Sequence, residues 1–192
     1  LLSALGRHEE AIREIRTARD LDPLSPRISA NVGFTFYAAR RYSEALEELN
    51  KALEVEPNHA MTHVYLGWVY EAMGKYEEAI RCYLRSRELG GELKYGDIGL
   101  ACCDALMGKR EEARKILNDI IEYSKGHYVS SVAISWVFVA LGEKDQVFAW
   151  LDKAYRERDP FLIMFAKSHH LFDPIRSDPR FTDLMRKIGL KK

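Results

Sequence analysis

The side chains that could do chemistry are few, and their spacing does not suit a metal site. His169 and His170 are adjacent and lie near Asp173, but neighbouring residues on a helix point about 100° apart. A zinc site needs three or four converging ligands, and no cysteine or further ligand shares this neighbourhood. We therefore expect the two histidines to lie at a partly exposed helix end and predict no metal site.

Two further groups also lack the pattern of a catalytic centre. Ser124, Lys125 and His127 lie together, but no acid is placed to orient the histidine and the GxSxG motif is missing. Cys102 and Cys103 lack the CxxC spacing of redox and zinc-binding cysteines. The chain also lacks the GxGxxG and GxxxxGK motifs of nucleotide-binding proteins. The sequence therefore predicts no enzyme, no catalytic residue and no cofactor.

The composition predicts a folded, soluble and helical protein. The 192 residues include 29 Lys+Arg and 29 Asp+Glu, so no overall field attracts a polyanion. From Arg176 onward six basic residues stand against two acidic ones, which we interpret as the solvated face of an end cap. No apolar run approaches the roughly 18 residues of a membrane span. We expect neither nucleic acid nor membrane as a partner, and three cysteines without a disulfide pattern favour a reducing, cytoplasmic location.

The strongest signal is an internal repeat of 34 residues. The segments LGRHEEAIREIRTARDLDP, ARRYSEALEELNKALEVEP and MGKYEEAIRCYLRSRELGG align without a gap, and the same step reaches MGKREEARKILNDIIEYSK and LGEKDQVFAWLDKAYRERD. Small residues recur in an upstream apolar stretch, at Gly33, Gly67, Ala101 and Ser135, and larger ones recur downstream, at Leu49, Tyr83, Leu117 and Leu151. We predict that each unit is a helix pair that packs closely and buries its apolar face against its neighbours.

Capping residues and glycines mark the ends of the predicted helices. Ser25, Asp159 and Asp178 each precede a proline, the arrangement of an N-cap followed by proline at the first helical position. Glycines recur where the two helices of a unit meet, at Gly6, Gly74, Gly108 and Gly142. Glycine favours the left-handed turn that ends a helix.

This pattern resembles the tetratricopeptide repeat family. The matching residues are Gly67, Tyr70, Ala79 and Tyr83 in the best unit, and Pro57 closes the unit before it. The tryptophan usual near the start of the first helix is replaced by Ser29, His63, Asp97 and Ser131. The resemblance implies an all-α solenoid, a right-handed superhelix of about five antiparallel helix pairs with a C-terminal helical cap.

The period divides the chain into units. We place a repeat array over residues 1–161, with units at 1–25, 26–59, 60–93, 94–127 and 128–161, and a degenerate sixth unit with a capping helix over 162–192. Within the latter we expect one helix over 162–172, stopped by Pro174, and another over 180–189. The ending resembles that of bacterial multidomain regulators, in which a winged-helix DNA-binding, cyclase-like or Ser/Thr kinase domain precedes such repeats. We therefore expect the chain to be part of a longer protein.

The first helices of such a solenoid line its concave side. The predicted groove there is aromatic and nearly uncharged, and comprises Asn31, Phe34, Tyr37, Tyr65, Trp68, Glu71, Tyr95, Ile98, Cys102 and Trp136. Tryptophan and tyrosine are common at binding hot spots. We predict a protein–protein interaction scaffold, a regulatory part of a larger protein, that binds an apolar or amphipathic protein segment in this groove.

Two alternatives stay open from the sequence. Trp68 and Trp136 lie one residue from the buried small-residue position, so they can belong to the core instead of the groove. The chain can also be a self-assembly element. In that case its repeats stack end to end into a homo-oligomer through an open N-terminal repeat, or its groove is occupied by its own tail, residues 161–165.

Overall fold

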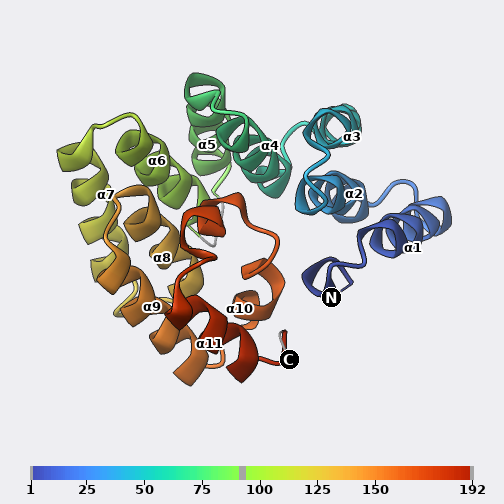
Figure 1. The fold of residues 1–192 in the computed structure, drawn as a ribbon. Helices are drawn as coiled ribbons and strands as arrows, with labels where there is room; N and C mark the ends of the chain where they lie inside the picture. The colour runs from blue at the N-terminus through green and yellow to red at the C-terminus, as the bar shows by residue number, and fades with distance from the viewer. Residues whose placement is uncertain (1, 91–93, 191–192) are drawn as a thin grey trace.

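Helices follow one another along an arc in the fold of this chain (Figure 1). The computed structural model describes residues 2–90 and 94–190, and every regular element in these ranges is a helix. In chain order they are η1 (Ser3–Leu5), α1 (His8–Leu21), α2 (Pro26–Ala38), α3 (Tyr42–Val55), α4 (Ala60–Ala72), α5 (Tyr76–Glu88), α6 (Tyr95–Leu106), α7 (Arg110–Tyr123), α8 (Ser131–Ala140), α9 (Lys144–Arg156), α10 (Pro160–Phe165), η2 (His170–Ile175) and α11 (Pro179–Lys187). None of these helices is long and apolar enough to cross a membrane.

The helices pack as consecutive pairs because each unit combines two kinds of helix. The odd-numbered helices from α1 to α9 are amphipathic and bury the same register position, at Ala11, Ala45, Ala79, Ala113 and Val147. The even-numbered helices from α2 to α8 carry apolar residues on more than one side, since they pack against their own partner and against neighbouring units. The fold is therefore the predicted all-α solenoid of helix pairs.

The small residues of the repeat let the paired backbones approach closely. A Cβ atom on Gly33 would lie 2.4 Å from Leu49 Cγ, and one on Gly67 would lie 2.2 Å from Tyr83 Cε1. Gly99 contacts the same tyrosine ring, since a Cβ there would lie 2.4 Å from Tyr83 Cζ. The predicted pairing of small and large residues is confirmed in these units.

The predicted helix ends are also confirmed. The side chains of Ser25, Asp159 and Asp178 accept hydrogen bonds from the backbone N–H groups of Ile28, Phe161 and Arg180. The four predicted glycines have positive φ between 74° and 82°. At the equivalent position of the second unit Arg40 takes the left-handed conformation, with φ of 63°, and its guanidinium donates to Asp173 Oδ1 at 2.7 Å.

The C-terminal part lies inside the arc (Figure 1) and differs from the expectation of one helix over residues 162–172. Helix α10 ends at Phe165, and η2, which contains Pro174, begins only at His170. Between them the chain turns, and the Arg176 guanidinium donates hydrogen bonds to the carbonyl oxygens of Ala166, Lys167 and His169. These bonds satisfy carbonyl groups that a continuous helix would have paired internally.

Candidate functional site

The concave surface is contacted by the chain's own C-terminal segment, defined here as residues 160–176. The ring of Phe165 lies 5.9 Å from that of Phe34, 5.4 Å from that of Trp68 and 5.1 Å from that of Trp136, measured between centroids. The imidazole of His169 stacks on Trp136 at 3.9 Å with an interplanar angle of 12°. Helices α2, α4 and α8, which are far apart in sequence, therefore meet one short segment.

Most of the predicted groove residues are consequently buried. Tyr37, Trp68, Glu71, Tyr95, Ile98, Cys102 and Trp136 are buried, while Asn31, Phe34 and Tyr65 keep partial exposure. Trp68 is 2% exposed and Trp136 is 1% exposed, so neither lines an open trough in this arrangement. Their burial agrees with the alternative that both tryptophans are core residues. A direct binding role stays a prediction for Asn31, Phe34 and Tyr65.

A buried polar cluster joins the C-terminal segment to the first helices. The hydroxyl of Tyr37 lies 2.8 Å from His170 Nδ1, and His170 Nε2 lies 3.2 Å from Glu71 Oε1. The other carboxylate oxygen, Glu71 Oε2, accepts a hydrogen bond from the Tyr83 hydroxyl at 2.5 Å. The Tyr83 hydroxyl thus pairs one oxygen of the buried Glu71 carboxylate, which would otherwise be costly to bury, whereas the other oxygen lies close to His170 Nε2 without a hydrogen-bond partner.

The expectation of partly exposed histidines is wrong for His169, whereas His170 keeps partial exposure. His169 is 0% exposed, because the turn after α10 directs it between the rings of Trp68 and Trp136. The sequence signal that accompanies this burial is the apolar stretch FLIMF just before the two histidines. Among residues 2–90 and 94–190, no three His, Cys, Asp or Glu side chains come together to hold a metal ion.

Burial keeps the hydroxyl, thiol and imidazole groups of this region uncharged. Desolvation raises the pKa of Tyr37 well above its ordinary value and raises that of Tyr65 to about 12. Desolvation also raises the pKa of the Cys102 thiol, and it lowers the pKa of His169 well below 6.5. A protonated phenol or thiol is a hydrogen-bond donor and a poor nucleophile. These groups therefore suit packing and recognition.

A cavity of about 710 Å³ is the open remainder of the concave side. It lies between η1, α1, α2, the start of α4, and α10, and we call it the N-terminal cavity. Four predicted groove residues line it, namely Asn31, Phe34, Tyr65 and Tyr95. Sequence reasoning missed the other lining residues, which are Leu2, Ser3, Ala4, Ala11, Glu14, Ile15, Arg27, Ala30, Thr35, His59, Met61, Phe161, Met164 and Phe165.

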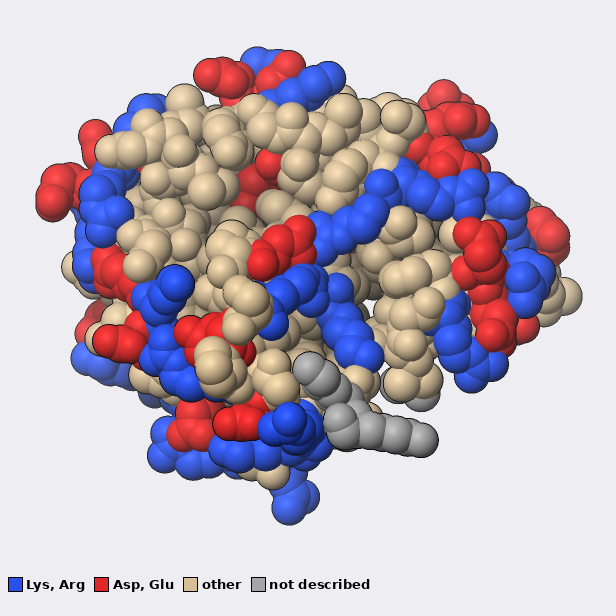
Figure 2. Space-filling model, viewed as in Figure 1, with Lys and Arg blue, Asp and Glu red and all other residues tan. Residues whose placement is uncertain are grey.

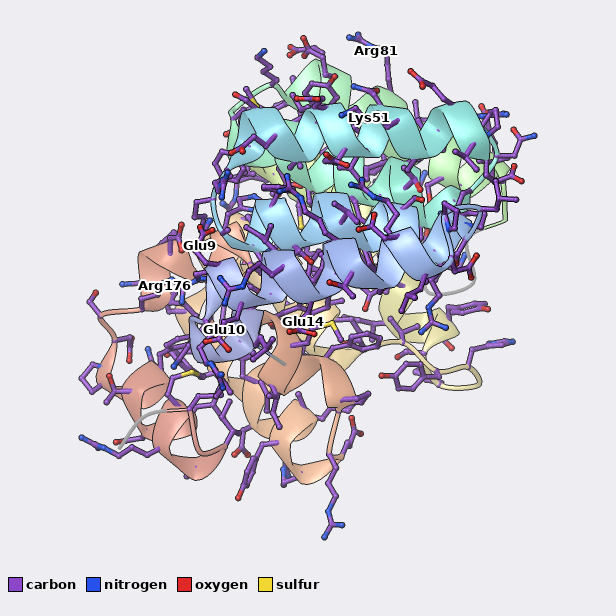
Figure 3. All side chains as sticks on the ribbon, turned by 90° about the vertical axis from the view of Figure 1, so that its right-hand side faces the viewer. Glu9, Glu10, Glu14, Lys51, Arg81 and Arg176 are labelled. Carbon is purple, nitrogen blue, oxygen red and sulfur yellow. The ribbon has the colours of Figure 1, made fainter. Side chains whose placement is uncertain are left out.

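The N-terminal cavity has an apolar floor and charged groups at its rim. The floor is formed largely by aromatic and aliphatic side chains, among which Phe34 and Tyr65 stack at 5.1 Å. The Tyr65 hydroxyl donates to Asn31 Oδ1 at 3.4 Å. Glu14 and Arg27 are exposed, and Figure 3 shows Glu14 on the side of α1 that faces the C-terminal helices. An amphipathic guest would thus meet apolar and charged groups together.

The charges on the outer surface are mixed. On the face seen in Figure 2, basic and acidic side chains are interspersed and neither sign dominates a large region. Many charged side chains of the molecule pair locally, such as Lys51 with Glu47 at 2.6 Å and Arg186 with Asp183 at 2.8 Å. Exposed pairs of this kind add little to stability, so their main effect is to keep the surface polar.

Comparison with known proteins supports the class of protein that the fold indicates, a solenoid of helical repeats. Residues 24–90 match the tetratricopeptide repeat family. A tetratricopeptide repeat protein from Parabacteroides merdae ATCC 43184 has a similar structure, with a TM-score of 0.64 and 17% identity over 96% of this chain and 72% of that one. The comparison with curated protein sequences gives no match. Residues 24–90 therefore resemble tetratricopeptide repeats, and the chain has the fold of a tetratricopeptide repeat solenoid.

A second solved structure has the same fold at nearly the same length. YrrB, described as a TPR protein with an unusual peptide-binding site, matches with a TM-score of 0.52 and 17% identity over 92% of this chain and 91% of its own. Tetratricopeptide repeats generally mediate protein–protein interaction. The resemblance to bacterial multidomain regulators stays a prediction.

Proposed function

We propose that the chain is a protein-interaction scaffold whose binding site is the N-terminal cavity, where it holds an apolar or amphipathic segment of a partner protein. The observation that carries this proposal is the apolar floor of a 710 Å³ cavity with Glu14 and Arg27 at its rim. Pockets of this size, largely apolar with a few polar groups, are typical ligand sites. A peptide-binding protein of the same fold supports the choice of partner class.

The chemistry of the cavity defines what the guest must offer. Fully burying one Leu, Met or Phe side chain contributes about 1.5–3 kcal/mol, and aromatic rings such as Phe34 and Tyr65 provide its contact surface. Asn31 and Tyr65 hold polar groups beside the floor, where they can meet the backbone of an extended or helical guest. In this proposal the buried Trp68 and Trp136 support the floor from beneath and do not contact the guest.

The first test places a carboxylate in the cavity. Met164 lines it and is 42% exposed, so Met164→Asp should leave the fold intact. Peptides are selected from a displayed library on the wild-type chain, and their affinity for the variant is measured by fluorescence polarisation. We expect Met164→Asp to weaken binding by about tenfold or more, because a charge opposite an apolar anchor costs at least 1.4 kcal/mol.

Met73 provides a matched control for that substitution. It is also a methionine, it is 37% exposed, and it lies outside the residues that line the cavity. Met73→Asp should bind the same peptides as tightly as the wild type does. Equal affinity of the wild type and Met164→Asp for every selected peptide would place the binding site elsewhere.

A second candidate function is self-assembly. Two exposed leucines at the C-terminal end of α1 favour it. Leu21 ends α1 and is 82% exposed, and Leu24 follows it in the turn and is 78% exposed. Large apolar groups exposed together often mark an interface. Molar mass is measured by size-exclusion chromatography with light scattering. We expect the mass of the wild type to rise with protein concentration, and the mass of the double variant Leu21→Glu/Leu24→Glu to stay at the value of a monomer. A wild-type chain that is monomeric over a wide concentration range would eliminate this candidate.

A further inference from the structure

The C-terminal segment docks on the concave side through a ladder of stacked rings. Tyr95 stacks on Trp136 at 5.9 Å and 24°, Trp136 stacks on His169 at 3.9 Å and 12°, and His169 stacks on His170 at 4.9 Å and 24°. The first two rings belong to helices α6 and α8, and the last two belong to the C-terminal segment. Docking of the segment therefore depends on His169 fitting beside Trp136 and on His170 fitting beside Tyr37.

Several polar atoms in this interface are buried without a hydrogen-bond partner. They include Trp136 Nε1, His169 Nε2 and the Tyr95 hydroxyl. Buried polar groups are normally paired, and an unpaired one loses its hydration without compensation. Water would satisfy these groups if the segment left the surface. The apolar contacts of this interface therefore favour docking, whereas its unpaired polar atoms favour release, because released atoms can form hydrogen bonds with water.

Burial and the neighbouring basic groups disfavour the protonated form of His169 while the segment is docked. From its own segment His169 faces His170 and Arg176. It also faces the phenol of Tyr37, on α2, and Arg40, in the turn that follows α2. The nearby carboxylates are engaged elsewhere, since Glu71 contacts His170 and Tyr83, and Asp173 contacts Arg40 and Arg176. Burial, followed by these positive groups, lowers the pKa of His169 well below the ordinary 6.5.

We propose that the C-terminal segment is a built-in occupant of the concave surface, that protonation of His169 releases it, and that its release extends the partner site from the N-terminal cavity onto Trp68 and Trp136. This inference rests on the proposed function, because it describes how access to the same concave surface is regulated. The C-terminal segment borders the cavity, because Phe161, Met164 and Phe165 form part of its wall. Release of the segment would therefore enlarge the site without moving the helix pairs.

The direction of the pH dependence follows from the neutral state of docked His169. The released side chain titrates near its ordinary value of 6.5, whereas the docked one stays neutral at lower pH. Docking is therefore unaffected above that value and weakens as pH falls below it. The ratio of released to docked molecules rises by up to about tenfold for each further pH unit.

Tryptophan quenching by acrylamide tests this inference without any partner. Every protein carries Trp150→Phe, so that emission comes from Trp68 and Trp136. Between about pH 7.5 and about pH 5, we expect the quenching constant to rise while the far-UV circular dichroism keeps its helical signal. His169→Phe retains a ring that can stack on Trp136 but cannot be protonated, and its quenching should stay low over the whole range. His169→Gln removes the same proton with a smaller polar side chain, and should also be insensitive to pH.

His63→Gln is the matched control, since it removes a histidine of α4 that lies outside the ring ladder and the cavity lining, and leaves His169 and His170 in place. It should keep a rise in quenching at acid pH. Three results would overturn the inference. They are quenching of the Trp150→Phe protein that does not change down to about pH 5, an equal rise in both His169 variants, or a rise that coincides with loss of the helical signal.

Failure of the proposed function and failure of this release are distinguishable. Binding of selected peptides to the cavity is measured at about pH 7.5, where the segment is docked, and does not depend on release.

Discussion

Replacement of Trp136 by alanine is expected to lower the free energy of unfolding by about 3–5 kcal/mol. Its ring is 1% exposed and contacts Trp68, Tyr95, Phe165 and His169. Loss of the indole would leave a cavity where α8 meets the C-terminal segment, and the surrounding rings cannot collapse fully into it. Urea unfolding followed by far-UV circular dichroism, with linear extrapolation to water, measures the change.

Trp150 provides the comparison for that experiment. It lies on α9, keeps partial exposure, stacks on Phe138 at 6.3 Å and carries Lys153 over its ring. Trp150→Ala should cost about 1–2 kcal/mol, because less apolar surface is lost from the interior. If Trp136→Ala folds and costs no more than Trp150→Ala, the ring of Trp136 is not part of the core and the described docking of the C-terminal segment is incorrect.

Substitution of Gly67 by alanine is expected to cost about 1–3 kcal/mol. The added Cβ would lie 2.2 Å from Tyr83 Cε1, and the tyrosine ring cannot move away from it. Gly99 also packs against that ring, and the hydroxyl is hydrogen-bonded to Glu71. Equilibrium unfolding in urea measures the loss, and Gly126→Ala is the control, since a Cβ there meets no atom within 4 Å.

A double-mutant cycle tests the physical cause of this loss. Units that carry a Cβ at the position of Gly67, with Ala101 and Ser135, have leucine at the position of Tyr83. Gly67→Ala combined with Tyr83→Leu should therefore cost less than the sum of the two single changes, by about 0.5–3 kcal/mol. Strict additivity would show that the clash between the alanine methyl group and the tyrosine ring is not the source of the loss.

The helix-pair fold could be predicted from the sequence because its determinants are local. A period of 34 residues, a small residue opposite a large one, and caps such as Ser25 and Asp159 all act within one unit or between neighbouring units. Gly33 facing Leu49 and Gly67 facing Tyr83 are separated by only 16 residues in each case. Contacts this close in sequence produce a pattern that each unit repeats, so five copies reinforce one interpretation.

The candidate site could be predicted only in part. Asn31, Phe34 and Tyr65 lie at the open cavity, whereas Trp68 and Trp136, predicted for the same groove, are buried. Residue type does not separate the two outcomes, because a binding surface and a core both use large aromatic side chains. The same limit applies to His169, whose polar ring suggested exposure but which is 0% exposed.

The sequence by itself determined the repeat, the helix pairs, the caps and the aromatic character of the inner helices. The tertiary structure alone decided which part of that aromatic surface stays open. The decisive contacts join Tyr37 to His170 and Arg40 to Asp173, across 133 residues in both cases. No periodic pattern encodes such a contact, because the C-terminal segment occurs once and its place depends on the shape that all the preceding helix pairs form together.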